Sequence, residues 1–511
     1  MSVSLTTHDL YSLRRAIAES LPSVDHAGAQ IQQIPALTYV PPSHAKALDP
    51  ESSVVEGIRG AGKSFWWAAL ASGEHRNYVV NAFPDVHLNP STIVHQGFGD
   101  ASGSVDAPSK DVLAKLFLDF NNPRAIWRAV LAHKLDFPMP FPQQAQKGDE
   151  KGDEKDQGIW STRTEWVKNN PALFDDLLVG VDTGLRRDGK TAMVLFDALD
   201  RLAVTWQDIR PLARGLLQVA QDMRATRCIR LKIFVRPDML EDKAIVGFPD
   251  ASKLLARRAN LNWRKVDLYA LFFQCMGNAK TAGGESFRSL TQQTLALSWQ
   301  KTDDLWLIPK EICGDEALQE NLFQALAGKT MSASPTGLKR GNPYKWVVNH
   351  LQDGRDQVSP RSFCEALRQA AEKSMSDFET YPLPLHFKAI QAGVQAASAI
   401  RMNELVHEDY PWVEHVMSPL RGELTVPCFP KDISAIWQRH EVLNTLGDAL
   451  NDSSKLVKLP PQHLTDGYEG VLLDLMELGL IQRLTDGRIQ MPDVYRIAFG
   501  LGRRGGVKPL K

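Results

Sequence analysis

The feature that most constrains this chain is an eight-residue stretch, "GIRGAGKS", which fits the pattern G-x-x-x-x-G-K-[ST] at every fixed position. Glycines let successive backbone N–H groups turn inward around an anion, and the N-terminus of a following helix adds partial positive charge. The lysine of the pattern reaches the β- and γ-phosphates of a nucleotide, and the hydroxyl that follows it binds Mg²⁺. The nucleotide-binding residues predicted in this way are Gly57, Arg59, Gly60, Ala61, Gly62, Lys63 and Ser64.

The segments on either side of this stretch supply the strand and the helix that such a loop requires. Residues 52–57 are predicted to form a strand, "GKSFWWAALAS" a helix that closes near Gly73, and "RNYVVNAF" the next strand. Farther along, "TAMVLFDALDRLA" and "IRLKIFVRPDML" contain apolar runs suited to buried central strands. Strands that alternate with helices predict an α/β fold, namely the parallel sheet of a P-loop NTPase flanked by helices.

A phosphate loop needs a second carboxylate, at the end of a neighbouring strand, to hold the metal ion. The apolar run "MVLF" ends in Asp197, which is therefore predicted to hold Mg²⁺ together with Ser64. Hydrolysis also needs a group that orients the attacking water. Because Ala198 occupies the position after Asp197, the best candidate is Asp200, for which a helix-capping or surface role is the alternative. Glu56 is a poorer candidate.

Two arginines are candidates for contact with the nucleotide. Arg236 follows the strand in "LKIFVRPDML", where a basic side chain can sense the γ-phosphate; the alternative is a salt bridge with Asp238. Arg361 lies in the first turn of a helix that Ser359 is predicted to cap, and it could reach over the nucleotide or be an ordinary surface arginine. The sequence has no N/T-K-x-D stretch of the kind that recognises guanine, so ATP is favoured over GTP.

Composition excludes several other classes of protein. The formal net charge is −1, so no overall basic field draws the chain onto nucleic acid. The five cysteines are scattered without a CxxC pair, which argues against a disulfide framework or zinc site and suits a reducing cytosol. The N-terminus lacks a signal-peptide pattern and no apolar run reaches membrane-spanning length, so a cytoplasmic protein is expected.

The pattern along the chain predicts four parts. Residues 1–45 form an N-terminal helical extension, and residues 46–250 form the ATPase core. Within the core, a tandem KGDE repeat has almost no apolar residues, which predicts a disordered, solvated insert at about 138–158. An acidic recruiting segment is the sharper alternative for this insert. Residues 251–378 are predicted to form a helical lid, because four stretches there have helical spacing.

The fourth part, residues 379–511, is predicted to be a winged-helix-like domain. Its "GYEGVLLDLMELGLIQRLTDGRIQMPDVYRIAFGL" contains a helix and two short strands around Asp486-Gly487, a strong hairpin signal. The chain then ends in a basic tail whose cations are Arg503, Arg504, Lys508 and Lys511.

In this order, "EGIRGAGKS", "VLFDALDRL", "IFVRPDML" and "SPRSF", closed by a helix-hairpin module, resemble the STAND-like and KAP-like P-loop ATPases of bacteria. This branch is close to the AAA+ ATPases, and the resemblance covers residues from about 40 to 375. The spacing Asp197-x-x-Asp200 is similar to the second nucleotide motif of the group. Ala198 departs from the familiar catalytic acid, so turnover is expected to be slow or to need a partner.

The resemblance implies an ATP-dependent switch that changes lid position or assembly state. Many relatives serve in bacterial defence against phage or mobile DNA, often with a separate effector, and this role is implied by the family alone. The expected cofactors are ATP and Mg²⁺. The expected partners are a separate effector or regulatory protein and further copies of the chain, with no membrane.

Two other functions remain open beside an ATPase switch that acts on a protein. The alternative is an ATP-dependent initiator or regulator that binds duplex DNA through the C-terminal domain and the basic tail. The second alternative is a nucleotide-binding scaffold that does not hydrolyse ATP. The helix "GYEGVLLDLMELGL" contains Glu469, Asp474 and Glu477 but no lysine or arginine, which favours the protein partner over a DNA groove.

Overall fold

The computed structural model describes residues 5–22, 38–82, 86–99, 107–137, 152–302, 304–333, 340–451 and 460–503. Backbone contacts divide this chain into two compact units. The first, which we call the sheet unit, runs from Val40 to Asn262. The second, the helical unit, combines the N-terminal helix with the chain from Trp263 onward.

The sheet unit is built on five parallel strands in the order β2-β3-β4-β1-β5. The strands are β1 (Val54–Glu56), β2 (Ile93–Phe98), β3 (Ala192–Phe196), β4 (Ile229–Val235) and β5 (Ala259–Asn260). The predicted parallel α/β sheet is therefore confirmed, and the loop after β1 leaves from the middle of the sheet. Because β5 pairs with β1, the sheet unit extends to Asn262, beyond the predicted boundary at residue 250.

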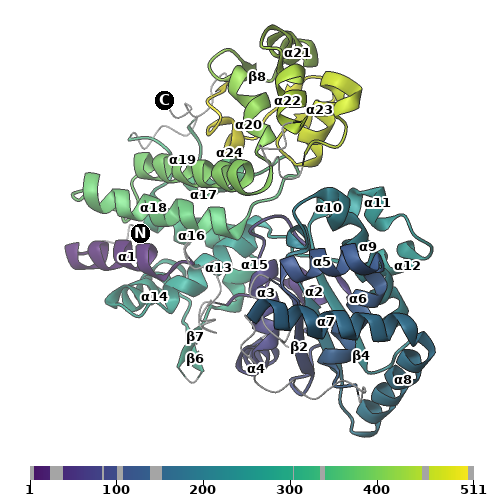
Figure 1. Ribbon diagram of the computed structural model, residues 1–511. Helices are drawn as coiled ribbons and strands as arrows, with labels where there is room; N and C mark the ends of the chain where they lie inside the picture. The colour runs from purple at the N-terminus through teal and green to yellow at the C-terminus, as the bar shows by residue number, and fades with distance from the viewer. Residues whose placement is uncertain are drawn as a thin grey trace. The chain divides into compact units, whose positions relative to one another are not determined.

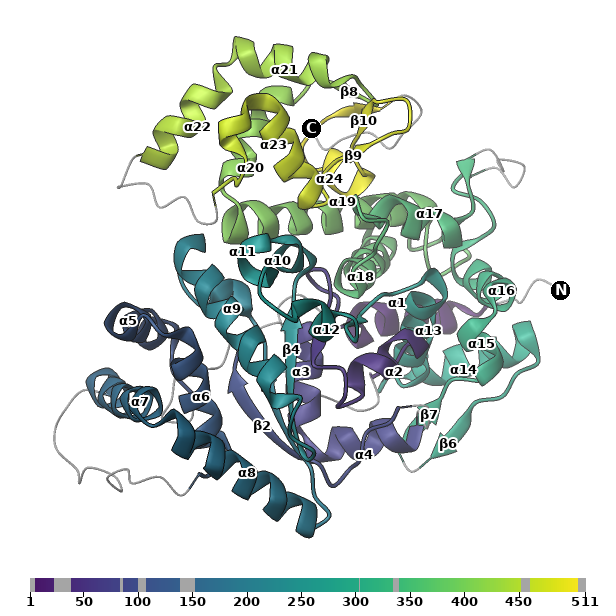
Figure 2. The same ribbon diagram turned by 90° about the vertical axis from the view of Figure 1, so that its right-hand side faces the viewer.

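Helices cover both faces of this sheet (Figures 1 and 2). Their bounds are α2 (Pro42–Leu48), α3 (Lys63–Ala71), α4 (Gly73–Ala82), α5 (Lys110–Phe120), α6 (Pro123–Lys134), α7 (Gly152–Asn169), α8 (Pro171–Arg187), α9 (Trp206–Met223), α10 (Pro237–Glu241), α11 (Lys243–Val246) and α12 (Ala251–Leu255). Met193 and Leu195 of β3 belong to the core that α2, α3 and α4 cover. On the other face, Phe196 packs edge-to-face against Trp127 of α6. This burial on both sides explains why the strand is apolar throughout.

One predicted strand is wrong. Residues 76–82 of the segment "RNYVVNAF" lie in α4, where Val79 is buried against the core with Tyr78 and Val80 beside it. The second strand of the sheet instead begins at Ile93. A short run of apolar and β-branched residues fits a buried strand and a buried helix turn equally well, and here packing against α3 decides for the helix.

The predicted insert is shorter than the sequence indicates. Residues 138–151 lie outside the described part of the chain, but residues 152–158 form the first turns of α7 and are not a loop. Three side chains at helical spacing, Trp160, Thr164 and Val167, are buried, and α7 packs on α6. This buried stripe anchors the helix on α6.

The helical unit contains the predicted lid helices and the C-terminal domain. Its helices are α1 (Thr7–Ser20), α13 (Lys265–Gly277), α14 (Ala282–Leu295), α15 (Lys310–Gly314), α16 (Glu316–Ala327), α17 (Pro343–Leu351), α18 (Pro360–Asp377), α19 (Phe387–Asn403), α20 (Trp412–Met417), α21 (Pro430–Arg439), α22 (Val442–Asn451), α23 (Gly467–Glu477) and α24 (Asp493–Arg496). A buried aromatic cluster holds the lid helices together: Tyr269 stacks on Tyr344 and donates its hydroxyl hydrogen to that residue's carbonyl. Among the described helices of both units, none is long and apolar enough to cross a membrane.

The C-terminal part of this unit has the element order of a winged helix. Short strands β8 (Thr425–Val426) and β11 (Gly502–Arg503) pair in parallel, and β9 (Gln482–Arg483) and β10 (Ile489–Gln490) form the predicted hairpin. Gly487 of the hairpin turn has φ 82°, which glycine adopts at little conformational cost. A further hairpin, β6 (Gln300–Thr302) with β7 (Leu305–Leu307), lies between α14 and α15.

The N-terminal helix is part of the helical unit and not a separate extension. Arg14 of α1 is only 3% exposed, and its guanidinium donates to carbonyl oxygens of the turn between α18 and α19. The acceptors are Phe378, Glu379, Tyr381, Leu383 and Pro384, at 3.0–3.1 Å. One side chain therefore fixes both α1 and this turn, since buried carbonyls require donors.

Replacing Arg14 is expected to destabilise the helical unit. Arg14→Ala leaves five carbonyl groups without their donor, so the free energy of unfolding should fall by about 3 kcal/mol. Urea unfolding followed by circular dichroism measures this change. The matched control is Arg15→Ala: Arg15 is half exposed and pairs with Glu19, so its loss should leave the free energy of unfolding almost unchanged. Equal effects of the two substitutions would contradict the role of Arg14.

Candidate functional site

The predicted phosphate loop, residues 57–64, joins β1 to α3 at the carboxyl end of the sheet. Gly60 and Gly62 have φ values of 76° and 103°, a backbone conformation that favours glycine. At Gly57, a Cβ atom would lie only 3.2–3.3 Å from side-chain atoms of Ala61, Leu261 and Lys63. The glycines are thus required by the shape of the loop, which places the N-terminus of α3 behind it.

Lys63, the first residue of α3, is bonded to its own loop. Its Nζ donates to the carbonyl oxygens of Gly57 at 2.9 Å and Ile58 at 3.0 Å. Burial lowers the pKa of Lys63 to about 8, although Asp197 and Asp200 act in the opposite direction. The side chain is therefore mostly charged at neutral pH. Its ammonium group lies beside the loop, where an anion bound by the loop would be.

Ser64 and Asp197 are in contact at the carboxyl ends of the strands. Ser64 Oγ donates to Asp197 Oδ2 at 2.6 Å, and the backbone N–H of Asp197 donates to the carbonyl of Phe98 at 2.9 Å. Asp197 is 1% exposed, and burial raises its pKa while the bond from Ser64 and the charge of Lys63 oppose that rise. A hydroxyl and a carboxylate in contact are the oxygen ligands that Mg²⁺ prefers, so this pair fits the predicted metal site.

Arg236 follows β4 and pairs with two carboxylates. It forms a two-pronged ion pair with Asp238 at 3.1 and 3.0 Å and a further bond of 3.2 Å with Asp200. The salt bridge with Asp238, which was the alternative role for Arg236, is present. Asp200 does not have the helix-capping or surface role that was its alternative, because it pairs with Arg236. Burial alone would raise the pKa of Asp200, but the charges of Arg236, Lys63 and Arg201 outweigh it and leave that pKa below its ordinary value.

How Asp200 reaches the site could not be predicted from its residue type or spacing. Ala198 adopts φ 57° and ψ 39°, a left-handed conformation that alanine rarely takes, and a 3₁₀ turn over Leu199–Arg201 follows. This reversal after Asp197 turns the chain back, so that Asp200 pairs with Arg236. An alanine in the left-handed conformation often marks a functional constraint. The residue type alone does not predict this conformation.

Two other predicted residues have different surroundings. Glu56, at the end of β1, pairs with Arg258 at 3.2 Å. Arg361 belongs to the helical unit, where it pairs with Glu404 at 2.8 Å. The side chain of Ser359 caps α18, as predicted, by accepting a bond from the backbone N–H of Ser362. The role of Arg361 over a nucleotide stays a prediction.

The sheet unit therefore brings five of the predicted side chains together: Lys63, Ser64, Asp197, Asp200 and Arg236. Asp238 joins them as a residue that the sequence suggested only as a salt-bridge partner. The loop follows β1, the metal-site carboxylate follows β3, and β4 lies between these two strands. This topology is that of the parallel sheet of a P-loop NTPase fold.

Comparison with known proteins adds little at the level of sequence: no family model and no curated protein matches the chain. Two solved structures align over most of it. Cdc6p from Pyrobaculum aerophilum is 11% identical, with 91% of this chain and 93% of that chain covered and a TM-score of 0.30. The ORC2 protein of Aeropyrum pernix, solved in ADPNP and ADP complexes, is 11% identical, with 90% and 94% covered and a TM-score of 0.36. At these values the likeness carries no functional inference.

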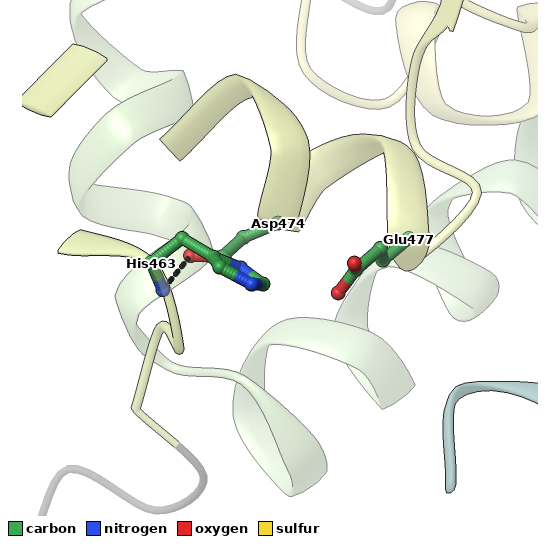
Figure 3. Close-up of side chains that lie close together, drawn as sticks. All are labelled: His463, Asp474 and Glu477. Carbon is green, nitrogen blue, oxygen red and sulfur yellow. Dashed lines mark hydrogen bonds and ion pairs between the residues drawn. The ribbon is translucent and has the colours of Figure 1, made fainter. Parts of the chain in front are cut away.

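A second polar cluster lies in the helical unit, where Asp474 and Glu477 of α23 face His463 (Figure 3). Asp474 is 4% exposed and accepts two bonds from His463, from Nδ1 at 2.7 Å and from the backbone N–H at 3.1 Å. Because an ionised carboxylate only accepts, Nδ1 carries the hydrogen. These bonds fasten the segment before α23 onto the helix, and they account for the cluster structurally.

This clasp predicts a pH-dependent contribution to stability. The hydrogen bond to Asp474 raises the pKa of His463, although partial burial opposes the rise. The stabilisation is therefore complete below the unfolded pKa of about 6.5 and is lost as pH rises through the higher folded pKa. Urea unfolding should show a larger difference between wild type and His463→Ala at pH 5.5 than at pH 8.5. With Asp474→Asn as the background, that pH dependence should disappear; its persistence would contradict the clasp.

Proposed function

We propose that the chain binds ATP with Mg²⁺ on residues 57–64 and hydrolyses it as a switch that acts on a protein partner. The observation that carries the proposal is the 2.6 Å contact between Ser64 Oγ and Asp197 Oδ2, beside the ammonium group of Lys63. A complete phosphate loop and a strand-end carboxylate are the two parts that a P-loop nucleotide site needs. Both are present at one edge of one sheet.

Each group has a role that its position supports. Lys63 exchanges its bonds to the carbonyls of Gly57 and Ile58 for bonds to phosphate oxygens. Ser64 and Asp197 hold the metal ion, and the backbone of Arg59 to Gly62 surrounds the phosphates. Bound Mg·ATP supplies the phosphoryl group that is transferred to water.

Asp200 and Arg236 are the groups proposed for hydrolysis itself. Asp200 is the carboxylate that orients water, and Arg236 stabilises the charge that develops on the transferred phosphoryl group. Their ion pair, 3.2 Å long, links the two roles. Turnover is proposed to be slow or partner-dependent, because the position after Asp197 is an alanine; a scaffold that never hydrolyses ATP is the limiting case.

The surface of the winged-helix-like domain supports a protein partner over DNA. Glu469 and Leu473 of α23 are exposed, and the helix bears no basic residue. The arginines of the hairpin are engaged: Arg483 pairs with Glu469, and Arg488 pairs with Asp486. A helix that enters a groove of DNA meets phosphates, which such a surface would repel.

The basic tail keeps duplex DNA as the alternative partner. Arg503 pairs with Asp493 at 3.1 Å, and the other predicted cations of the tail lie outside the described residues. A STAND-like or KAP-like membership, a separate effector protein, assembly into homo-oligomers and a role in defence against phage remain proposals that come from the resemblance alone.

Steady-state ATP hydrolysis by the purified chain, with and without duplex DNA, tests the proposal. We expect Mg²⁺-dependent turnover that DNA does not change, and Lys63→Ala should abolish ATP binding because the phosphates lose their main cation. Turnover that rises with DNA and falls with added salt would instead assign DNA as the partner. Undiminished ATP affinity in Lys63→Ala would contradict the assignment of the loop. Binding without turnover would favour the scaffold.

Substitution of Asp200 should separate binding from hydrolysis. Asp200→Asn is expected to retain ATP affinity but to lower kcat about 100-fold, the scale of a lost acid–base group. The matched control is Asp238→Asn, which removes the other carboxylate on Arg236 and leaves Asp200 in place. If both variants slow turnover equally, the shared role is to hold Arg236. An unchanged rate in Asp200→Asn would remove this residue from the mechanism.

A further inference from the structure

A cavity of about 230 Å³ lies in the sheet unit at the amino ends of the strands, whereas the phosphate loop lies at their carboxyl ends. Arg230 and Leu231, at the beginning of β4, line it together with Glu51 and Ser53, which precede β1. Ala220, Met223, Arg224 and Arg257 complete the lining. The amino ends of the strands therefore frame this cavity, whereas the predicted nucleotide site lies at their carboxyl ends.

Positive charge dominates the cavity, because three arginines face one carboxylate. Glu51 is shared: its side chain pairs with Arg230 at 2.7 Å and with Arg257 at 3.8 Å. Within the described part of the chain, Arg224 pairs with no carboxylate and donates a long bond of 3.3 Å to the neutral side chain of Gln221. A single carboxylate leaves a net charge of about two to be balanced, so a dianion fits better than a carboxylate monoanion.

The three guanidinium groups come from different elements and are held differently. Arg230 is 18% exposed and fixed by the carbonyls of Thr226 and Ile229 as well as by Glu51. Arg224 follows α9 and Arg257 follows α12, and both are exposed, so they can close around an occupant. Planar guanidinium groups bind phosphoryl oxygens two at a time, which suits this set.

The wall of the cavity that carries Glu51 is rigid. Lys232 is fully buried and donates to the carbonyls of Ala47, Asp49 and Ser52 at 2.7–2.9 Å. These bonds fix the turn between α2 and β1. A preformed wall lowers the entropy that binding would otherwise lose.

From this geometry we infer that the cavity is a second anion site, which binds a phosphate or diphosphate group independently of the phosphate loop. Its volume is below the roughly 300–1,000 Å³ of sites for drug-sized ligands, so the bound group is small. Ser53 and Gly57 are four positions apart along an extended strand, about 13 Å at 3.3 Å per position, so the two sites do not overlap. The inference holds whether or not the loop hydrolyses ATP.

Equilibrium dialysis of the full chain with radiolabelled pyrophosphate, at constant ionic strength, tests the site. In Lys63→Ala, which disables the loop, about one pyrophosphate per chain should still bind. Adding Arg224→Gln and Arg257→Gln to that variant should weaken binding at least tenfold. The matched control adds Arg186→Gln and Arg187→Gln, which remove the same charge at the end of α8, from residues that do not line the cavity, and should leave binding unchanged.

The outcomes separate the two sites. Absence of binding in Lys63→Ala, or equal weakening by both pairs of substitutions, would overturn the second site and leave the phosphate loop untouched. Failure of the loop instead shows as identical binding by wild type and Lys63→Ala. Competition by unlabelled phosphate and AMP identifies the source: competition by both assigns a phosphoryl group that a nucleotide can carry, and competition by phosphate alone assigns the free ion. Circular dichroism checks that each variant is folded.

Discussion

Parallel pairing of β3, β4 and β1 is the constraint on which the site depends. These strands are far apart in the sequence, yet their carboxyl ends lie side by side, so Asp197, Arg236 and the phosphate loop reach the same edge. Burial of the strands on both faces fixes their register, because a slip by one residue would turn every buried side chain of β3 toward the opposite layer. The precision of the Ser64–Asp197 contact follows from this packing and not from the loop alone.

The same burial sets the electrostatics of the site. Lys63 and Arg236 lie among three carboxylates, and none of these charged groups stands alone. Low exposure strengthens each attraction, and it also makes an unpaired charge unfavourable. Under the proposed function, these pairs are exchangeable: phosphate oxygens would replace the backbone carbonyls at Lys63, and a metal ion would replace the hydrogen that Ser64 donates to Asp197.

Much of this arrangement could be predicted from the sequence, because its signals are local. The glycines and Lys63 predict the loop, apolar runs predict β3 and β4, and Asp486-Gly487 predicts the hairpin. What escaped prediction depends on tertiary packing. The segment before residue 83 is a helix because it packs on α3, and the chain after residue 250 belongs to the sheet because β5 pairs with β1. The left-handed Ala198 has no sequence signal, since alanine is not a residue that this conformation favours.

Ala198 also bears on how hydrolysis would be controlled under the proposed function. Its backbone reversal places Asp200 against Arg236, and the arginine keeps the pKa of that carboxyl low. A phosphate group beside Arg236 competes with Asp200 for the same positive charge. As that attraction weakens, burial raises the pKa of Asp200 and makes the carboxylate a stronger base. The missing acid after Asp197 therefore does not exclude turnover, because the ion pair can make the basicity of Asp200 depend on the phosphate that is bound.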